Sequence, residues 1–545
     1  MTSGDVTNGD VTNGDVTSGG VLPREERFVL AVDLGTGGPK VGLVSVVGRV
    51  AWQDHIPVET TWIDGGGAVQ DAGEWWQIIV DATRRAMAEG VVGPEQVVAV
   101  SVTGQWASTV PVDAEGNPVG DCVMWMDTRG GPHARKAVGG AAAGYSPVAA
   151  ATWLRRSAAP PSTAGDDSLG HMLHLEKDQP IVAKAARWYL EPVDYLSMRF
   201  TGVAAASPGS MTAAWLTDTR QPDIRDYDPV LVRRSGVNAA KLPPLRPTCS
   251  VIGAVRPGVA AELGISAAAR VVTGTLDLHS AAVGSGAVLD YEPHMVISTT
   301  SWISCPVEKK KTDLIRQLAT VPGLTPDRYL LVNNQDTAGR CLEWLRDNIV
   351  APDDGLLAGG ERAGYEAMVD LATRVPAGSG NVIFTPWLTG ERTPIADRHA
   401  RGGFHNLSLS TQRGHLVRAV LEGVAYNSRW LLGAAEKFTE RRLEPIRLIG
   451  GGAQADLWCQ IMADVLDRRI ERVAQPLHAN LRGAAIFAGI ALGDVRAEEV
   501  RSLVDVDRVF SPDPANRAVY DRLFAEFPKL YKAQKGMYAR LNRSR

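Results

Sequence analysis

The first regular stretch of the chain constrains its fold more than any other feature. Two apolar runs with β character, residues 28–32 and 41–46, flank a turn of small residues. The turn carries Asp33, Thr36 and Lys40. Its backbone N–H groups and hydroxyl can bind phosphate oxygens while the carboxylate faces the accompanying metal ion. The turn is followed by a strand rather than a helix, so it is not a Walker loop. Two interpretations remain open at this point, a nucleotide-phosphate hairpin and an ordinary Gly-rich β-turn.

The length of the chain predicts two domains. At 545 residues it exceeds what one hydrophobic core usually supports, so two domains of roughly 250 residues each are expected. Hydrophobic residues make up 45% and charged residues 22%, as in a soluble globular protein. The net charge of −4 provides no basic field for nucleic acid. We therefore expect a small-molecule ligand and no nucleic-acid partner.

Neither the cysteines nor the apolar segments indicate export or a membrane. The five cysteines are scattered and form no CxxC pair, which favours reduced structural thiols. The sequence shows no secretory signal pattern and no apolar run of about 18 residues. The chain is therefore predicted to be cytoplasmic and to make no membrane contact.

The order of the expected elements indicates a duplication. Residues 1–24 hold a Gly-Asp-Val-Thr repeat, which predicts a disordered leader. Residues 25–290 begin with a βββαβ order, and residues 291–545 open a similar α/β series, with the boundary near residues 290–293. Two α/β halves of similar plan favour a duplicated architecture that flanks a central cleft.

The expected elements follow the spacing of apolar residues. In the first half they are strands 28–32, 41–46 and 51–58, helix 74–88 and strand 97–102. In the second half they are a strand at 295–304, helices near 340–349 and 411–432, strand 446–449, helix 456–466 and a last Ala/Gly-rich helix near 481–492. Leu457, Ile461 and Val465 recur at i, i+4 and i+8 and give helix 456–466 one apolar face.

Asp277 is the first candidate for chemistry. It follows the apolar run 270–273 and stands where a strand turns into a small-residue helix. A carboxylate there can accept the proton of a hydroxyl that attacks phosphorus, or can cap the helix. His279 is a second possible base, although a lone His is more often structural.

Two further turns are candidates for binding phosphate or a nucleoside. Thr300 and Ser301 lie in a hydroxyl-rich strand turn at the start of the second half, as the Asp33 turn lies at the start of the first. A Thr-rich strand favoured by β propensity is the alternative. Gly450, Gly451 and Gly452 join a strand to a helix, where glycines allow close approach and the helix dipole favours anions.

The residues around Gln105 and Trp125 are typical of a site for a polyhydroxylated ligand. Gln105 and Trp106 follow a strand, and Trp125, Asp127 and Arg129 follow the next extended segment. An aromatic ring can cover C–H faces while charged groups bind hydroxyls. An ion pair beside a core Trp is the alternative. The loop at 388–394 is expected to be structural, with its charged pair tying a domain together.

With these motifs in view, the chain resembles the FGGY carbohydrate kinases, and most of all their xylulose kinase branch. The resemblance runs from about residue 27 to residue 493 or beyond. Its landmarks occur in family order, and that order makes the set specific. They are Asp33-Leu-Gly-Thr36, Gly104-Gln105, Trp125-x-Asp127-x-Arg129, Asp194-Tyr-Leu with Thr201-Gly202, Gly274-x-x-Asp277, Thr300-Ser301, the long block from 388–394 through 401–404 to 418–424, and Gly450-Gly-Gly-Ala453 with Asp464.

The resemblance implies two actin-like, ribonuclease H-like ATPase domains that close on ATP and a sugar. It implies that Asp277 is the catalytic base and also contacts the substrate, that Asp33 supports Mg²⁺, and that the C-terminal domain binds ATP. The residues implied for the sugar are Gln105, Trp106, Trp125, Asp127 and Arg129. The residues implied for the nucleotide and its phosphates are Gly35, Thr36, Lys40, Thr300, Ser301, Gly339, Gly451, Gly452, Ala453 and Asp456.

The chain departs from the branch at three places. Trp106-Ala107 replaces the Met-His pair typical of xylulose kinases, Thr299 stands where a Gly is usual, and Pro39 precedes Lys40. We predict an ATP- and Mg²⁺-dependent kinase for a pentulose, D-xylulose first. The alternatives are a kinase for ribulose, erythritol or gluconate, and a weakly catalytic, nucleotide-gated sugar-binding protein. A homodimer is one assembly that the sequence allows.

Overall fold

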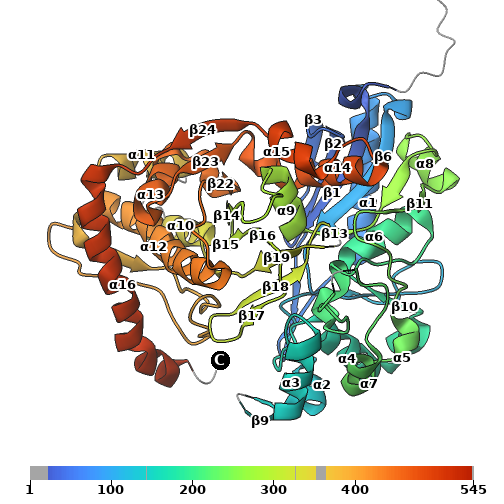
Figure 1. Cartoon of the computed structure of the whole chain (residues 1–545), viewed down its shortest axis with the longest axis horizontal. Coiled ribbons are helices and arrows are strands. Elements are labelled where there is room, and N and C mark those ends of the chain that lie inside the picture. Colours follow the sequence, from blue (N-terminus) through green and yellow to red (C-terminus); the bar gives the residue numbers. More distant parts are fainter. Residues whose placement is uncertain (1–21, 143, 222, 326, 351–363, 543–545) are drawn as a thin grey trace, which may run out of the picture.

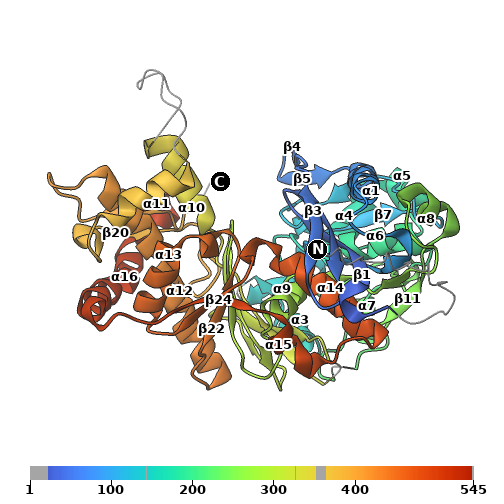
Figure 2. The ribbon, with the colours of Figure 1, turned by 90° about the horizontal axis from the view of Figure 1, so that it is seen from above.

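The protein folds into two α/β halves that lie side by side (Figures 1 and 2). The computed structural model describes residues 22–142, 144–221, 223–325, 327–350 and 364–542. The predicted leader lies outside the described residues up to residue 21. Over the described residues, no helix is both long and apolar enough to span a bilayer.

The first half is built on one mixed sheet with the strand order β11-β12-β6-β1-β2-β3, and β13 also pairs with β6. β1 and β2 form an antiparallel hairpin, while β6 runs parallel to β1. The elements of this half are β1 (Phe28–Gly35), β2 (Gly38–Ser45), β3 (Val50–His55), β4 (Thr61–Ile63), β5 (Gly67–Gln70), α1 (Ala72–Ala88), β6 (Val97–Gly104), β7 (Val110–Val112), β8 (Cys122–Val123), α2 (Gly131–Val138), β9 (Gly139–Ala142), α3 (Pro147–Arg156), α4 (Ser168–Asp178), α5 (Pro180–Ala185), β10 (Trp188–Leu190), α6 (Pro192–Thr201), α7 (Pro229–Ser235), β11 (Val251–Ala254), α8 (Pro257–Leu263), β12 (Arg270–Val272), β13 (Thr275–Leu276) and α9 (Asp277–Ser285).

The second half repeats this plan on a sheet with the order β15-β14-β22-β23-β24. β14 and β15 form the antiparallel hairpin, and β22 runs parallel to β14. The duplicated α/β architecture is thus confirmed. The elements are β14 (His294–Ile297), β15 (Ser301–Ser304), β16 (Pro306–Val307), β17 (Thr312–Asp313), β18 (Leu318–Pro322), β19 (Tyr329–Val332), α10 (Gly339–Leu345), α11 (Tyr365–Thr373), β20 (Ile383–Thr385), β21 (Gly403–His405), α12 (Arg413–Thr439), β22 (Ile446–Ile449), α13 (Asp456–Leu466), β23 (Ile470–Val473), α14 (Ala479–Leu492), α15 (Val500–Leu503), β24 (Val506–Phe510) and α16 (Pro514–Leu541).

Three sequence expectations need correction. The single strand expected at 295–304 is a hairpin, because the chain turns between β14 and β15. The first half is not a simple βββαβ series, because β4 and β5 intervene before α1 and pair with β8 in a separate sheet. The Ala/Gly-rich helix α14 is not the last helix, because α16 follows it.

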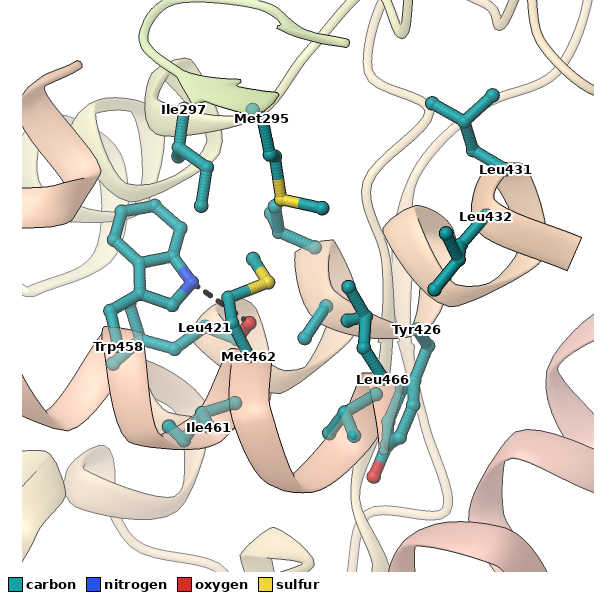
Figure 3. Close-up of a cluster of buried hydrophobic side chains, with 14 of the residues drawn as sticks. Met295, Ile297, Leu421, Tyr426, Leu431, Leu432, Trp458, Ile461, Met462 and Leu466 are labelled. Atoms are coloured by element: carbon teal, nitrogen blue, oxygen red, sulfur yellow. Dashed lines mark hydrogen bonds between the residues drawn. The ribbon is translucent and has the colours of Figure 1, made fainter. Parts of the chain in front are cut away.

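The core of the second half lies between α12, α13 and β14 (Figure 3). Ile461 and Val465 are buried as expected from their spacing, and Leu457 packs at the edge of the same cluster. The indole of Trp458 donates a hydrogen bond to the Leu421 carbonyl across 3.2 Å. This packing fixes β14, and with it the turn that follows β14.

Helix α14 connects the two halves, because it packs on the sheet of the first half (Figures 1 and 2). Its Leu481 and Phe487 share a buried cluster with Val29 and Val44 of that sheet. The domain boundary near residue 290 remains a prediction. With that boundary, α14 would belong to the second domain and pack on the sheet of the first.

Candidate active site

The β1–β2 hairpin places Asp33 and Lys40 next to each other on paired strands. The Lys40 ammonium nitrogen lies 3.5 Å from an Asp33 carboxylate oxygen, and Asp33 is 4% exposed. The hairpin requires glycine at Gly38, where φ is +123° and a Cβ would lie 2.1 Å from the Ile56 carbonyl oxygen. The hairpin is therefore held close to residues 56–58, which follow β3.

The hydroxyl of Thr36 at the tip of this hairpin is oriented by Trp125. The Trp125 indole N–H donates to Thr36 Oγ1 across 2.9 Å, and the Gln70 amide donates to the Thr36 carbonyl. Because the hydroxyl accepts from the indole, its own hydrogen remains available for a ligand oxygen. Two residues predicted for different ligands, the phosphate and the sugar, are thus in direct contact.

Asp33 and Asp277 lie on or directly after the two strands that flank β6, at the same edge of the sheet. Thr103 of β6 pairs with Asp33 on one side and with Thr275 on the other. Adjacent strands are about 4.8 Å apart, so β1 and β13 are separated by about 10 Å across β6. Asp277 follows β13 directly and begins α9. The register therefore brings together two carboxylates that are far apart in the sequence.

Burial, and then the charge of Asp33, raise the pKa of the Asp277 carboxyl to about 7. One Asp277 oxygen accepts the Leu278 N–H at 2.7 Å. Asp277 is not the N-cap of α9, which is Leu276. Asp277 as a whole residue is partly exposed, so a reacting hydroxyl can approach it.

His279 is held by the structure rather than presented to a ligand. Its Nε2 lies 2.8 Å from the Pro322 carbonyl oxygen, and its side chain is buried. Burial also lowers the pKa of its imidazole. These contacts favour the structural interpretation of His279.

The second hairpin turns at 298–300 and is packed against two glycine-bearing segments. A Cβ on Gly339 would lie 2.5 Å from the Ser298 carbonyl oxygen. A Cβ on Gly450 would lie 2.5 Å from the Ile297 carbonyl oxygen. Thr300 is partly exposed and Ser301 is buried. The candidate nucleotide residues from three separate segments therefore surround one turn.

Asp456 differs from the other nucleotide candidates. It opens α13 after the short helical turn Gly451–Gln454, in which Ala453 is buried. Its carboxylate pairs with Arg472 at 2.5 Å and also with Arg508. Its charge is thus already balanced by two guanidinium groups.

The Asp127–Arg129 pair is buried rather than placed on the surface. Arg129 Nη2 lies 2.6 Å from Asp127 Oδ2, and Asp127 is fully buried. Burial opposes ionisation of Asp127, but hydrogen bonds from Arg129 and from the Ala68 N–H outweigh it and lower the pKa of the carboxyl. A large part of the pair's hydrogen-bonding capacity is used within the protein.

Gln105 and Trp106 present polar atoms that lack protein partners. Gln105 is 4% exposed, and neither its amide nitrogen nor its amide oxygen has a hydrogen-bond partner among the described residues. The same holds for Trp106 Nε1. Buried polar groups are normally paired, so these atoms are suited to a ligand.

Two side chains at this site were not predicted to bind a ligand. Arg392 from the second half lies over the Trp125 ring, with its guanidinium carbon 5.9 Å from the centroid, and its Nε is 3.2 Å from Asp336 Oδ1. Trp215 packs edge-to-face against Trp106. Arg392 belongs to the block 388–394 that marked the resemblance, whereas no sequence pattern identifies Trp215.

Comparison with known proteins agrees with this arrangement. A family model described as the N-terminal domain of the FGGY family of carbohydrate kinases matches residues 28–142 and 165–284. The model for the C-terminal domain of that family matches residues 295–492.

Individual proteins are similar over nearly the whole chain. The xylulose kinase of Staphylococcus epidermidis (strain RP62A) is 27% identical over 94% of this chain and 98% of that protein. The gluconokinase of Bacillus licheniformis is 23% identical over 94% and 97%. The crystal structure of xylulose kinase from Rhodospirillum rubrum superposes with a TM-score of 0.78 at 26% identity, over 94% of this chain and 100% of that chain.

The fold and the two hairpins define a protein with two actin-like domains. The chain belongs to the FGGY family of carbohydrate kinases. It is therefore an ATP-dependent phosphotransferase with an alcohol group as acceptor, and a sugar kinase.

Proposed function

We propose that this kinase transfers the γ-phosphate of ATP to a hydroxyl of a pentulose, with D-xylulose as the first candidate. The observation that carries the proposal is the placement of Asp33 and Asp277 at strand ends on either side of β6. The similarity to a xylulose kinase over nearly the full length supports the choice of acceptor.

Asp277 acts as the general base in this proposal. It accepts the proton of the acceptor hydroxyl as that oxygen attacks the γ-phosphorus and the bond to the β-phosphate oxygen breaks. A carboxyl with a pKa of about 7 is well matched to proton transfer near neutral pH. Positioning and charge neutralisation provide most of the remaining catalysis.

The donor set fits Mg²⁺ bound together with nucleotide. Among the residues that the structure describes, no group of three or more His, Cys, Asp or Glu is arranged to hold a metal ion. Mg²⁺ commonly binds through one or two carboxylates and substrate phosphates, and Asp33 provides such a carboxylate. The ion would neutralise phosphate charge, while Lys40, Thr36 and Thr300 would orient the phosphate oxygens.

A kinase for ribulose, erythritol or gluconate is the second candidate, because Trp106 and Ala107 replace the pair typical of xylulose kinases. The similarity to a gluconokinase also supports it. A weakly catalytic sugar-binding protein is the third, motivated by Thr299 and Pro39. Tight binding of ATP and sugar in calorimetry, with negligible turnover, would favour that third candidate.

The test is an ADP-release assay with a panel of ketoses, polyols and gluconate. D-xylulose is expected to give the highest kcat/KM, and Asp277→Asn to lower kcat by about 10³-fold or more, since the acceptor proton then has no carboxylate to take it. Asp54→Asn, which alters a surface pair with Arg85, is the control. Sugar-dependent turnover that survives Asp277→Asn would remove Asp277 from this role.

We also propose that the protein forms a homodimer, and light scattering tests this oligomeric state.

A further inference from the structure

Trp106 and Trp215 form a pair of rings that we call the aromatic corner. Their ring centroids are 6.1 Å apart and the ring planes are inclined by 62°. Both residues are partly exposed. The two rings therefore contact each other, and both residues keep some exposed surface that a bound molecule can contact.

The aromatic corner borders Asp277. Gly104 pairs with Leu276 at the end of β6, so the chain leaves both strands at the same edge, toward Trp106 on one side and Asp277 on the other. Leu276 and Leu278, which flank Asp277, belong to the apolar cluster against which Trp106 and Trp215 pack. An acceptor that reaches the Asp277 carboxyl thus lies beside the two rings.

Trp215 is held in place by its surroundings. Its backbone has a φ of +56°, a left-handed conformation that bulky residues rarely adopt, at the end of the short helical segment Ser210–Ala214. Its indole N–H donates to Asp167 Oδ2 across 2.7 Å. Its carbonyl accepts the Trp153 indole N–H at 3.0 Å. The ring is therefore presented to Trp106 in one fixed orientation.

The polar atoms beside the corner match hydroxyl groups better than a carboxylate. The Gln105 amide offers an unpaired donor and an unpaired acceptor, and Trp106 Nε1 offers a donor. A hydroxyl both donates and accepts, so a polyol can satisfy all three atoms. A carboxylate that replaced this hydroxyl could only accept, so it could not pair with the Gln105 oxygen.

The charges around the corner also disfavour an anionic acceptor. The Arg129 guanidinium is engaged by Asp127 through its Nε and Nη2, and the Arg392 guanidinium is paired with Asp336. The acids Asp277 and Asp167 lie next to the aromatic corner. A carboxylate placed there would meet like charges whenever these acids are ionised.

We propose that Trp106 and Trp215 set acceptor specificity by packing on the C–H face of a neutral sugar or polyol, and that the site discriminates against sugar acids. This inference rests on the proposed function, in which Asp277 meets the acceptor hydroxyl. An aromatic face adds apolar contact area to an otherwise hydroxylated ligand. Trp106 and Trp215 would then contribute to acceptor binding and leave the nucleotide site unaffected.

The experiment compares Trp106→Phe and Trp106→Ala with the wild type on D-xylulose, D-ribulose, erythritol and gluconate. Loss of the ring in Trp106→Ala is expected to raise KM for the best neutral acceptor about tenfold, as expected for an aromatic contact worth about 1.4 kcal/mol. Trp106→Phe is expected to show a smaller increase. KM for ATP should stay within twofold, and Trp62→Phe, at a ring that is 70% exposed, is the matched control.

Each outcome separates this inference from the proposed function. Turnover of a pentulose with an unchanged acceptor KM in both Trp106 variants overturns the inference alone. Turnover of erythritol instead of a pentulose, with a KM that depends on Trp106, overturns the pentulose assignment alone. A higher kcat/KM for gluconate than for every neutral acceptor overturns both. Melting curves of the variants exclude loss of fold as the cause of a raised KM.

Discussion

At the scale of single residues, the protonation state of Asp277 is central to the chemistry. A base must be ionised to accept a proton, and burial together with Asp33 raises the pKa of this carboxyl to about 7. Because the pKa is raised, the carboxyl is protonated and inactive at lower pH and becomes competent as the pH increases through about 7.

We predict that kcat/KM for the acceptor rises with pH and levels off above about pH 8, one unit above the pKa of Asp277. A pH profile of the ADP-release assay from pH 5 to 9 measures this. Asp54→Asn should reproduce the wild-type profile. A profile that stays level from pH 8 down to pH 5 would contradict the assignment of Asp277 as the base.

The sequence predicted the residues that follow strand ends better than those that depend on tertiary contacts. Asp33 and Asp277 could be identified because each follows an apolar strand and occupies a family motif. Trp215 could not, because its left-handed backbone and its contact with Trp106 arise from packing between distant segments. The pairing of Asp456 with Arg472 and Arg508 is likewise set by the fold of β23 and β24.

At the scale of elements, the crossing of α9 and α14 depends on two glycines. A Cβ on Gly284 would lie 1.7 Å from the Ala479 carbonyl oxygen, and a Cβ on Gly483 would lie 1.9 Å from the Ser280 carbonyl oxygen. The two helices therefore touch through their backbones. Tight packing accounts for the small-residue run at 483–489, and the helix that begins with Asp277 depends on this contact.

We predict that Gly483→Ala destabilises the protein by roughly 1–3 kcal/mol, because the new methyl group must push two backbones apart. Thermal unfolding measures this as a lower midpoint, and activity should fall because Asp277 moves with α9. Gly433→Ala is the matched control, since Gly433 lies in α12 and, apart from its chain neighbours and the adjacent backbone of its own helix, no described atom lies within 4 Å of the position that a Cβ would take there. It should be neutral or stabilise by up to about 1 kcal/mol. Equal midpoints for the two variants would contradict the role of the crossing.

Element boundaries were predictable where the hydrophobic period was uninterrupted. Helix α13 occupies the expected range, and β22 does as well. Helix α16 was missed because it contains Pro528 and carries charges around much of its surface. Asp513 followed by Pro514 is a helix-start signal that could have indicated it.

At the scale of the whole molecule, the sheet of the first half is completed by a helix from the second. The cluster that α14 closes contains Val29, Ala31 and Ala99 from that sheet and Ala484 and Phe487 from α14. Without α14 this apolar surface would face water.

We predict that a fragment of residues 22–292 does not form a stable monomer. It should bind a hydrophobic dye and self-associate in size-exclusion chromatography. Addition of a fragment of residues 293–545 should suppress dye binding and restore sugar-dependent ADP release. The second fragment with Leu481→Asp and Phe487→Asp is the control that should fail to do so. A monomeric first fragment without dye binding would contradict this prediction.

The position of α14 has a consequence for synthesis on the ribosome. The strands β1, β2 and β6 are translated by residue 104, yet the helix that shields one of their faces ends at residue 492. The nascent chain must carry an unshielded β-surface through most of translation. The timing of translation and the supply of chaperones, rather than equilibrium stability alone, would then govern how much active enzyme a cell obtains.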